Sequence, residues 1–196
     1  MTEQMPARQP ASPRQPASPR QAALARAVVD LEEHVAQRGW DAPVGVFALV
    51  RTAAALEQDP ALAELLDDAA LAQARRDPQS LTMVEQENLP MAADLEDLLG
   101  RLAWPQTVDG VALAVERVVL PTEAEREAAA IPDPQERLAF LSARPDREDV
   151  RMVVGVLRTG ESWCAVRSRT RDSADRVVSG DMLVPGLIEA LGSTFV

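Results

Sequence analysis

The first regular pattern in the chain is a series of apolar residues spaced four and three positions apart. The stripe over residues 21–38 predicts an amphipathic helix, and Gly39 follows it as a left-handed end cap. Its members are Leu24, Val28, Leu31 and Val35. The next apolar run, residues 44–50, is short and rich in β-branched side chains, so it predicts a strand that is covered on both faces.

The rest of the chain continues to switch between helical and strand-like patterns. Apolar runs and alternation predict further strands over 81–87 and 111–120. Helical spacing or helix-start residues predict four more helices, over 59–75, 94–102, 134–143 and 182–194, the last with Asp181 as its cap. The acidic segment 121–133 is interrupted by prolines, and we expect a surface excursion with one helical turn.

A β-hairpin is the strongest local prediction. Two β-branched runs, 150–158 and 161–169, are joined at Thr159-Gly160, which is typical of a two-residue hairpin loop. Such a loop would place Val156 opposite Trp163. Both faces of the hairpin carry apolar side chains, so the sheet needs cover on each side.

These elements together predict the α+β class. We expect a single, mostly antiparallel sheet of about five strands with helices packed on it, and a C-terminal β-hairpin followed by a helix. Residues 21–196 would form one domain. Residues 1–20 repeat the segment QPASPR and lack bulky apolar side chains, so they predict a disordered Pro/Ser/Arg tail. No run is long enough for a signal peptide or a membrane span, which predicts a cytoplasmic protein.

Composition excludes several kinds of chemistry. The formal net charge is -11, which disfavours nucleic acid and anionic membranes as partners. All 20 basic residues are arginine, so no lysine is present to form a Schiff base or to hold a nucleotide phosphate. The single cysteine, Cys164, excludes an intramolecular disulfide, and the single histidine, His34, excludes a multi-histidine metal site. We therefore predict no cofactor and no metal.

Two pairs of residues are candidates for catalytic groups. Cys164 lies in mid-strand, where a cysteine is usually a small buried hydrophobe, and His34 lies in a helix beside acidic residues. Glu85 and Glu87 would share one face of a strand and so lie close enough to hold a cation. In a chain with 31 acidic residues such pairs also arise by chance, and we assign no catalytic residue.

An arginine strip is the candidate binding site. Arg167, Arg169 and Arg171 alternate along the end of the hairpin, Arg176 follows, and Trp163 precedes them on the same strand. Guanidinium groups in this arrangement would bind a carboxylate or phosphate through paired hydrogen bonds. The alternative is that these arginines neutralise acids on the adjacent strand and protect a sheet edge.

Several long segments resemble an uncharacterised family of actinobacterial proteins over residues 24–195. They are RGWDAPVGVFALVRTA (38–53), VEQENLP (84–90), LLGRLAWPQTVDGVALAVERVVLP (98–121), RPDREDVRM (144–152) and SGDMLVPGLIEALGSTF (179–195). The resemblance implies a bacterial cytosolic protein and transfers no activity. The order of elements is also similar to the small dimeric fold of type III secretion chaperones, an analogy from which the extra helices of 52–104 depart.

Two functions from different classes are consistent with these observations. The first is a non-catalytic interaction protein, a chaperone-like or adaptor-like binder with a protein partner or a second copy of itself. The alternative is a binding protein or enzyme for a small anion, using the arginine strip. The absence of a recognisable catalytic constellation favours the first.

Overall fold

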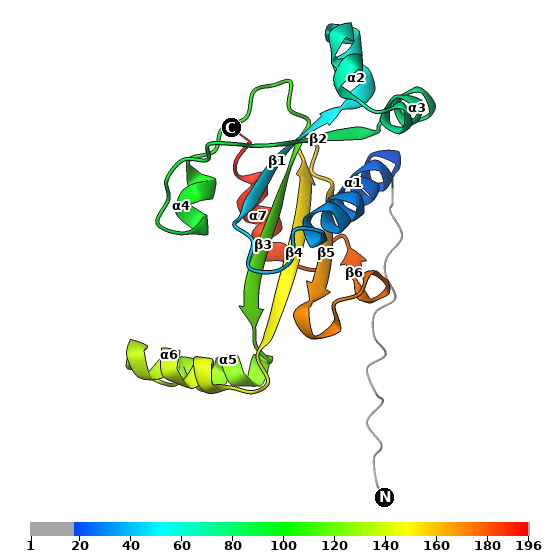
Figure 1. Cartoon of the computed structure of the whole chain (residues 1–196). Coiled ribbons are helices and arrows are strands. Elements are labelled where there is room, and N and C mark those ends of the chain that lie inside the picture. The colour runs from blue at the N-terminus through cyan, green and yellow to red at the C-terminus, as the bar shows by residue number, and fades with distance from the viewer. Residues whose placement is uncertain (1–17, 196) are drawn as a thin grey trace, which may run out of the picture.

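One antiparallel sheet organises the structure. A computed structural model describes residues 18–195, and its six strands are arranged in the order β2-β1-β3-β4-β5-β6 (Figure 1). The strands are β1 Gly45–Arg51, β2 Leu81–Glu85, β3 Gly110–Val119, β4 Glu148–Leu157, β5 Ser162–Ser168 and β6 Val178–Gly180. The expected α+β class and single sheet are confirmed, and the strand beyond the expected five is the short β6.

Helices lie on both faces of the sheet and beyond its ends. The α-helices are α1 Pro19–Ala36, α2 Thr52–Gln58, α3 Asp68–Arg76, α4 Leu95–Gly100, α5 Thr122–Ala129, α6 Pro134–Ala143 and α7 Pro185–Gly192. Three short 3₁₀ helices are η1 Pro60–Leu65, η2 Arg169–Arg171 and η3 Ala174–Arg176. The predicted tail falls almost wholly on residues 1–17, outside the described residues, whereas α1 already begins at Pro19 with Ser18 as its N-cap.

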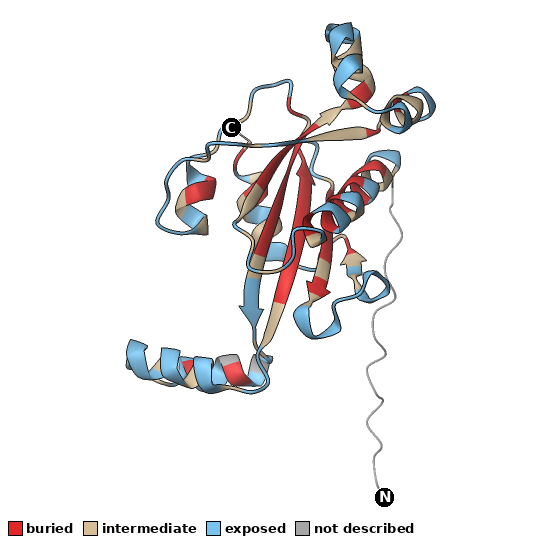
Figure 2. Cartoon of the chain, in the orientation of Figure 1, coloured by how far each residue is buried: buried red, intermediate tan, exposed pale blue. Residues whose placement is uncertain are grey.

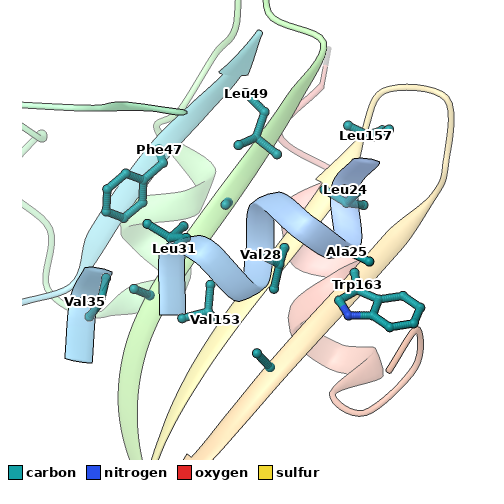
Figure 3. Close-up of a cluster of buried hydrophobic side chains, with 13 residues drawn as sticks. Leu24, Ala25, Val28, Leu31, Val35, Phe47, Leu49, Val153, Leu157 and Trp163 are labelled. Carbon is teal, nitrogen blue, oxygen red and sulfur yellow. The ribbon is translucent and has the colours of Figure 1, made fainter. Parts of the chain in front are cut away.

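Helix α1 covers one face of the central strands. Its apolar stripe packs on Phe47, Val153 and Trp163, which belong to three different strands (Figure 3). Gly155 lets the helix approach β4 closely, because a Cβ atom built there would lie 2.7 Å from Val28 Cγ2. The periodicity of 21–38 therefore predicted both the helix and the side that it buries.

Helices α4 and α7 cover the opposite face. Leu98, Leu99 and Leu191 pack there with Val154 and Cys164. Each central strand therefore alternates between two apolar clusters, as expected from its apolar side chains on both faces. Figure 2 shows the buried residues concentrated in the central strands and along one side of α1.

The hairpin is present, but its predicted register is wrong by one residue. Trp163 pairs with Gly155, not with Val156. Leu157 N–H donates to the Glu161 carbonyl, and Gly160, with φ of 97°, occupies the left-handed region, so the loop has three residues instead of two. This is the turn-plus-bulge loop that a glycine at the third position favours. A shift of one residue exchanges the two faces of β5 relative to β4.

Three predicted helix boundaries also differ. The helix expected over 59–75 is split, because Asp67 caps a new helix, α3, after the 3₁₀ segment η1. Helix α7 begins at Pro185, and Val184, not Asp181, is its N-cap residue. A proline disfavours helical backbone at the residue before it, which delays the start of this helix. The excursion after β3 contains α5, longer than the single turn expected.

Candidate functional site

Arg167 is buried under α1 in a two-fold ion pair with Glu32. Its Nε lies 2.6 Å from Glu32 Oε1 and its Nη2 lies 2.7 Å from Glu32 Oε2. Only 6% of the Arg167 side chain and 2% of the Glu32 side chain are exposed. The hydrogen bonds to Glu32 raise the pKa of Arg167. This guanidinium therefore joins α1 to β5, and its Nε and Nη2 atoms are already occupied.

Trp40, in the segment after α1, contacts two further arginines. The guanidinium carbon of Arg151 lies over the Trp40 ring, 4.4 Å from its centroid, and that of Arg169 lies 5.5 Å away. Trp40 Nε1 donates to Asp172 Oδ2 at 2.7 Å, and this bond, with the nearby Arg167, lowers the pKa of Asp172. Contact of an indole with guanidinium groups is a favourable cation–π arrangement.

The other predicted arginines contact acids from several elements. Arg169 binds both carboxylate oxygens of Asp41 at 2.9 and 2.8 Å, and the Arg171–Glu148 distance is 3.3 Å. Arg176 lies 3.5 Å from its neighbour Asp175 and is exposed. Strand β5 ends at Ser168, so these side chains do not form the straight strip expected. The arginines are paired with acids, as in the alternative interpretation, but Glu32 and Asp41 lie on α1 and in the segment after it and not on the adjacent strand.

Trp163 also lies inside the molecule. It is 4% exposed and packs beside Ala25 of α1 (Figure 3). Its Nε1 has no hydrogen-bond partner among the described residues. The five predicted site residues are thus divided between the core beneath α1 and the polar surface around it, and the structure does not gather them around one cavity.

Neither pair of candidate catalytic residues forms a site in the structure, because one pair is separated by the sheet and a member of the other is bound by an arginine. Cys164 lies in the cluster beneath α7, whereas His34 belongs to α1 on the other side of the sheet. Burial raises the pKa of the Cys164 thiol, which disfavours the reactive thiolate. Both oxygens of Glu85 are bound by Arg38 at 2.6 Å, which lowers the pKa of Glu85, and Glu87 lies beyond the end of β2.

No metal centre or membrane-spanning helix is found in residues 18–195. No three His, Cys, Asp or Glu residues there are grouped as ligands of a metal ion. None of the helices in the same part of the chain has the length and apolar character required to cross a membrane.

An apolar groove lies beside the end strand β2. Its cavity volume is about 340 Å³, and it lies between the segment α2–η1 and strands β1 and β2. The lining comprises Val50, Thr52, Ala55, Leu56, Leu62, Leu65, Leu66, Thr82, Met83 and Val84. Two of these residues are widely accessible, since Leu65 is 81% and Val84 48% exposed. We call this feature the β2 groove.

Among residues 18–195, no strand pairs with β2 on the side away from β1. Gln86 N–H donates to the Val46 carbonyl, and Thr52 N–H donates to the Ser80 carbonyl, which fixes the phase of the β1–β2 ladder. In an antiparallel ladder, successive residues direct their N–H and C=O groups to opposite sides. The main-chain groups of Leu81, Met83 and Glu85 therefore point away from β1, toward the open edge.

The comparisons with known proteins identify the family of this chain. A family model described as PPA1309-like protein matches residues 24–196. The chain belongs to the PPA1309-like protein family. This match confirms the resemblance over 24–195 to an uncharacterised family, and the description of PPA1309-like proteins states no activity. No curated protein matches the chain. No solved structure matches it either.

The β2 groove was not predicted from the sequence. Its residues Leu62, Leu65 and Leu66 fall within the single helix that was predicted over 59–75. Asp67 could have indicated the groove, because it is an N-cap residue inside the predicted helix. A cap at this position indicates that the preceding leucines belong to a separate segment.

Proposed function

We propose that this protein is a non-catalytic binding protein, chaperone-like or adaptor-like, that binds an extended apolar segment of a partner protein along β2. The observation that carries the proposal is the open backbone edge of β2 beside the β2 groove. A strand added to a sheet edge gains main-chain hydrogen bonds, and a neighbouring groove selects its side chains. The combination fits an extended peptide better than it fits a small solute.

The chemistry of the groove defines the partner segment. Its lining is hydrophobic except for the hydroxyl groups of Thr52 and Thr82, so the side chains that it receives would also be apolar. Alternate residues of an added strand point to the same face, which gives an apolar–any–apolar pattern. Burying an exposed Leu or Val contributes about 1.5–3 kcal/mol, so Leu65 and Val84 would supply much of the affinity.

The alternative function, binding of an anion by the strip Arg167, Arg169 and Arg171, has less support. Each of these arginines contacts at least one carboxylate within 3.3 Å. An anion at the strip would have to displace those carboxylates. Truncating one partner of the buried Arg167–Glu32 pair would also leave a buried charge uncompensated.

The test is selection of binding peptides followed by amide hydrogen exchange on the full chain. Peptides with alternating apolar residues should be enriched from a displayed random library. On binding, the amides of Leu81, Met83 and Glu85 should become protected, because an added strand accepts their hydrogen bonds. Leu65→Asp should abolish binding, whereas Leu138→Asp, at a similarly accessible site on α6, should leave it unchanged.

Two results would overturn the proposal. One is binding that protects a different surface while the β2 amides exchange as before. The other is equal loss of binding in both aspartate variants, which would indicate a non-specific hydrophobic effect. Edge-to-edge pairing of two copies through β2 would protect the same amides without peptide, and light scattering would show a dimer whose population depends on concentration.

A further inference from the structure

A basic cavity lies on the α1 side of the sheet, at the end where the β4–β5 loop is located. Its volume is about 280 Å³, and it is separate from the β2 groove. The lining residues include three arginines and a single acidic residue, which are Arg20, Arg51, Arg158 and Asp109. This local excess of positive charge contrasts with the formal net charge of -11 for the whole chain.

Asp109 holds Arg51 in a fixed orientation. The Arg51 backbone N–H donates to Asp109 Oδ2 at 2.8 Å, and Arg51 Nε donates to Asp109 Oδ1 at 2.8 Å. Both carboxylate oxygens of Asp109 therefore accept hydrogen bonds from Arg51, one from its backbone N–H and one from its Nε. The two terminal nitrogens of this guanidinium form no hydrogen bond to any described residue, so they remain available as donors.

Arg158 is held by backbone carbonyls, and no carboxylate of the described residues binds it. Its Nε donates to the Val108 carbonyl at 3.2 Å, and its Nη2 donates to the carbonyls of Trp104 and Pro105 at 3.2 and 3.1 Å. Its guanidinium carbon stacks 4.6 Å from the centroid of the Phe195 ring. These contacts fix the position of Arg158, and its positive charge is not compensated by a carboxylate within residues 18–195.

Arg20 adds a third guanidinium from the first turn of α1. It is exposed and forms no ion pair within residues 18–195. Helix α1 has 18 residues, and the amino end of a helix of that length carries a partial positive charge. Arginines from three segments that are distant in sequence therefore line the same cavity.

We propose that this cavity binds a small phosphate-bearing molecule. One guanidinium is sufficient to satisfy a carboxylate through two parallel hydrogen bonds, whereas a phosphate group offers more acceptor oxygens and nearly two negative charges. A lining with three arginines and one carboxylate therefore favours a phosphate over a carboxylate. The excess of two positive charges over Asp109 also matches a phosphate dianion.

The remaining lining limits the size and character of the ligand. The volume lies just below the ~300–1,000 Å³ of pockets for drug-sized molecules, so a phosphate or a small phosphate ester fits the cavity better than a nucleotide. The amides of Gln79 and Gln106 supply neutral donors and acceptors, and Leu81, Val108 and Leu157 supply an apolar surface. These groups would contact the organic part of the ester.

The test is isothermal titration of the full chain at constant ionic strength with inorganic phosphate, glycerol phosphate and succinate. Saturable binding of both phosphate probes is expected, with succinate clearly weaker. Arg20→Gln should weaken phosphate binding about tenfold (~1.4 kcal/mol) while the fold is retained, because Arg20 is exposed and forms no ion pair with the residues that the structure describes. Gln106→Glu should abolish binding by placing a second carboxylate in the cavity.

Arg75→Gln provides the matched control. Arg75 is exposed, forms no ion pair within the described part of the chain and does not line this cavity, so the variant changes the net charge equally and should bind phosphate normally. Equal weakening by Arg75→Gln and Arg20→Gln would overturn the proposal, since it would show only long-range charge. Failure of phosphate to saturate the protein, or succinate binding as tightly as phosphate, would also overturn it.

Discussion

Replacement of Glu32 by glutamine should destabilise the protein strongly. The substitution keeps the size of the side chain but removes the charge that compensates Arg167, at a site where both side chains are almost fully buried. Removing one partner of a buried ion pair typically costs about 3–5 kcal/mol. Asp172 also contacts Arg167, at 3.2 Å, but its side chain is 45% exposed and compensates poorly. We therefore expect a loss of about 3 kcal/mol.

Urea unfolding followed by tryptophan fluorescence would measure this change. Arg101→Gln is the control, because it breaks the exposed pair with Asp97, whose loss should change the free energy of unfolding little. The double variant Glu32→Leu, Arg167→Met should recover most of the loss, since apolar side chains of similar size often replace a buried pair without cost. If Glu32→Gln costs no more than Arg101→Gln, the reasoning from burial is refuted.

Three further predictions concern packing, reactivity and pH. Gly155→Ala should cost about 1–3 kcal/mol in thermal or urea unfolding, because the added methyl group would overlap Val28 of α1. Cys164 should react with a thiol reagent only as fast as the protein unfolds, since the thiol is buried and its pKa is raised; rapid mixing with the reagent measures this rate. The pKa of Asp172 is lowered in the folded state, so its stabilising contribution is complete above pH ~4 and is lost as the pH falls further; unfolding of Asp172→Asn across acidic pH should show a smaller loss.

Each of these predictions has a contrary result. A Cβ atom added at Gly100 would meet no neighbouring atom within 4 Å, so Gly100→Ala should not destabilise, and an equal cost at both glycines would contradict the packing argument. Rapid labelling of Cys164 in native buffer would show that the strand opens independently. Identical acid profiles for Asp172→Asn and the natural chain would show that this carboxylate has no role in acid sensitivity.

The fold was predicted well because its main signals are local. The stripe of α1 and the β-branched strands repeat with periods that a short window of sequence reveals. The hairpin register was wrong because it depends on the conformation of one residue, Gly160, whose φ of 97° creates a three-residue loop. The apolar pattern of the two strands is compatible with a loop of two or of three residues. It therefore does not specify the dihedral angles of the loop glycine.

The candidate sites were predicted less well because they depend on distant partners. Glu32 and Arg167 are separated by 135 positions, and no local pattern shows that they form an ion pair. The same applies to the basic cavity, which gathers Arg20, Arg51 and Arg158 from three segments. In a chain with 20 arginines, the distinction between a paired and an unpaired guanidinium emerges only after the strands are in register.

The excursion that carries α5 and α6 leaves the sheet after Val119 and returns at Glu148, and these two residues are direct partners across β3 and β4. The two helices pack mainly on each other, and Figure 1 shows them projecting from the end of the sheet. The ladder is thus complete without them. This position is a natural graft point, where a short turn or a foreign domain could replace the helices without altering strand pairing.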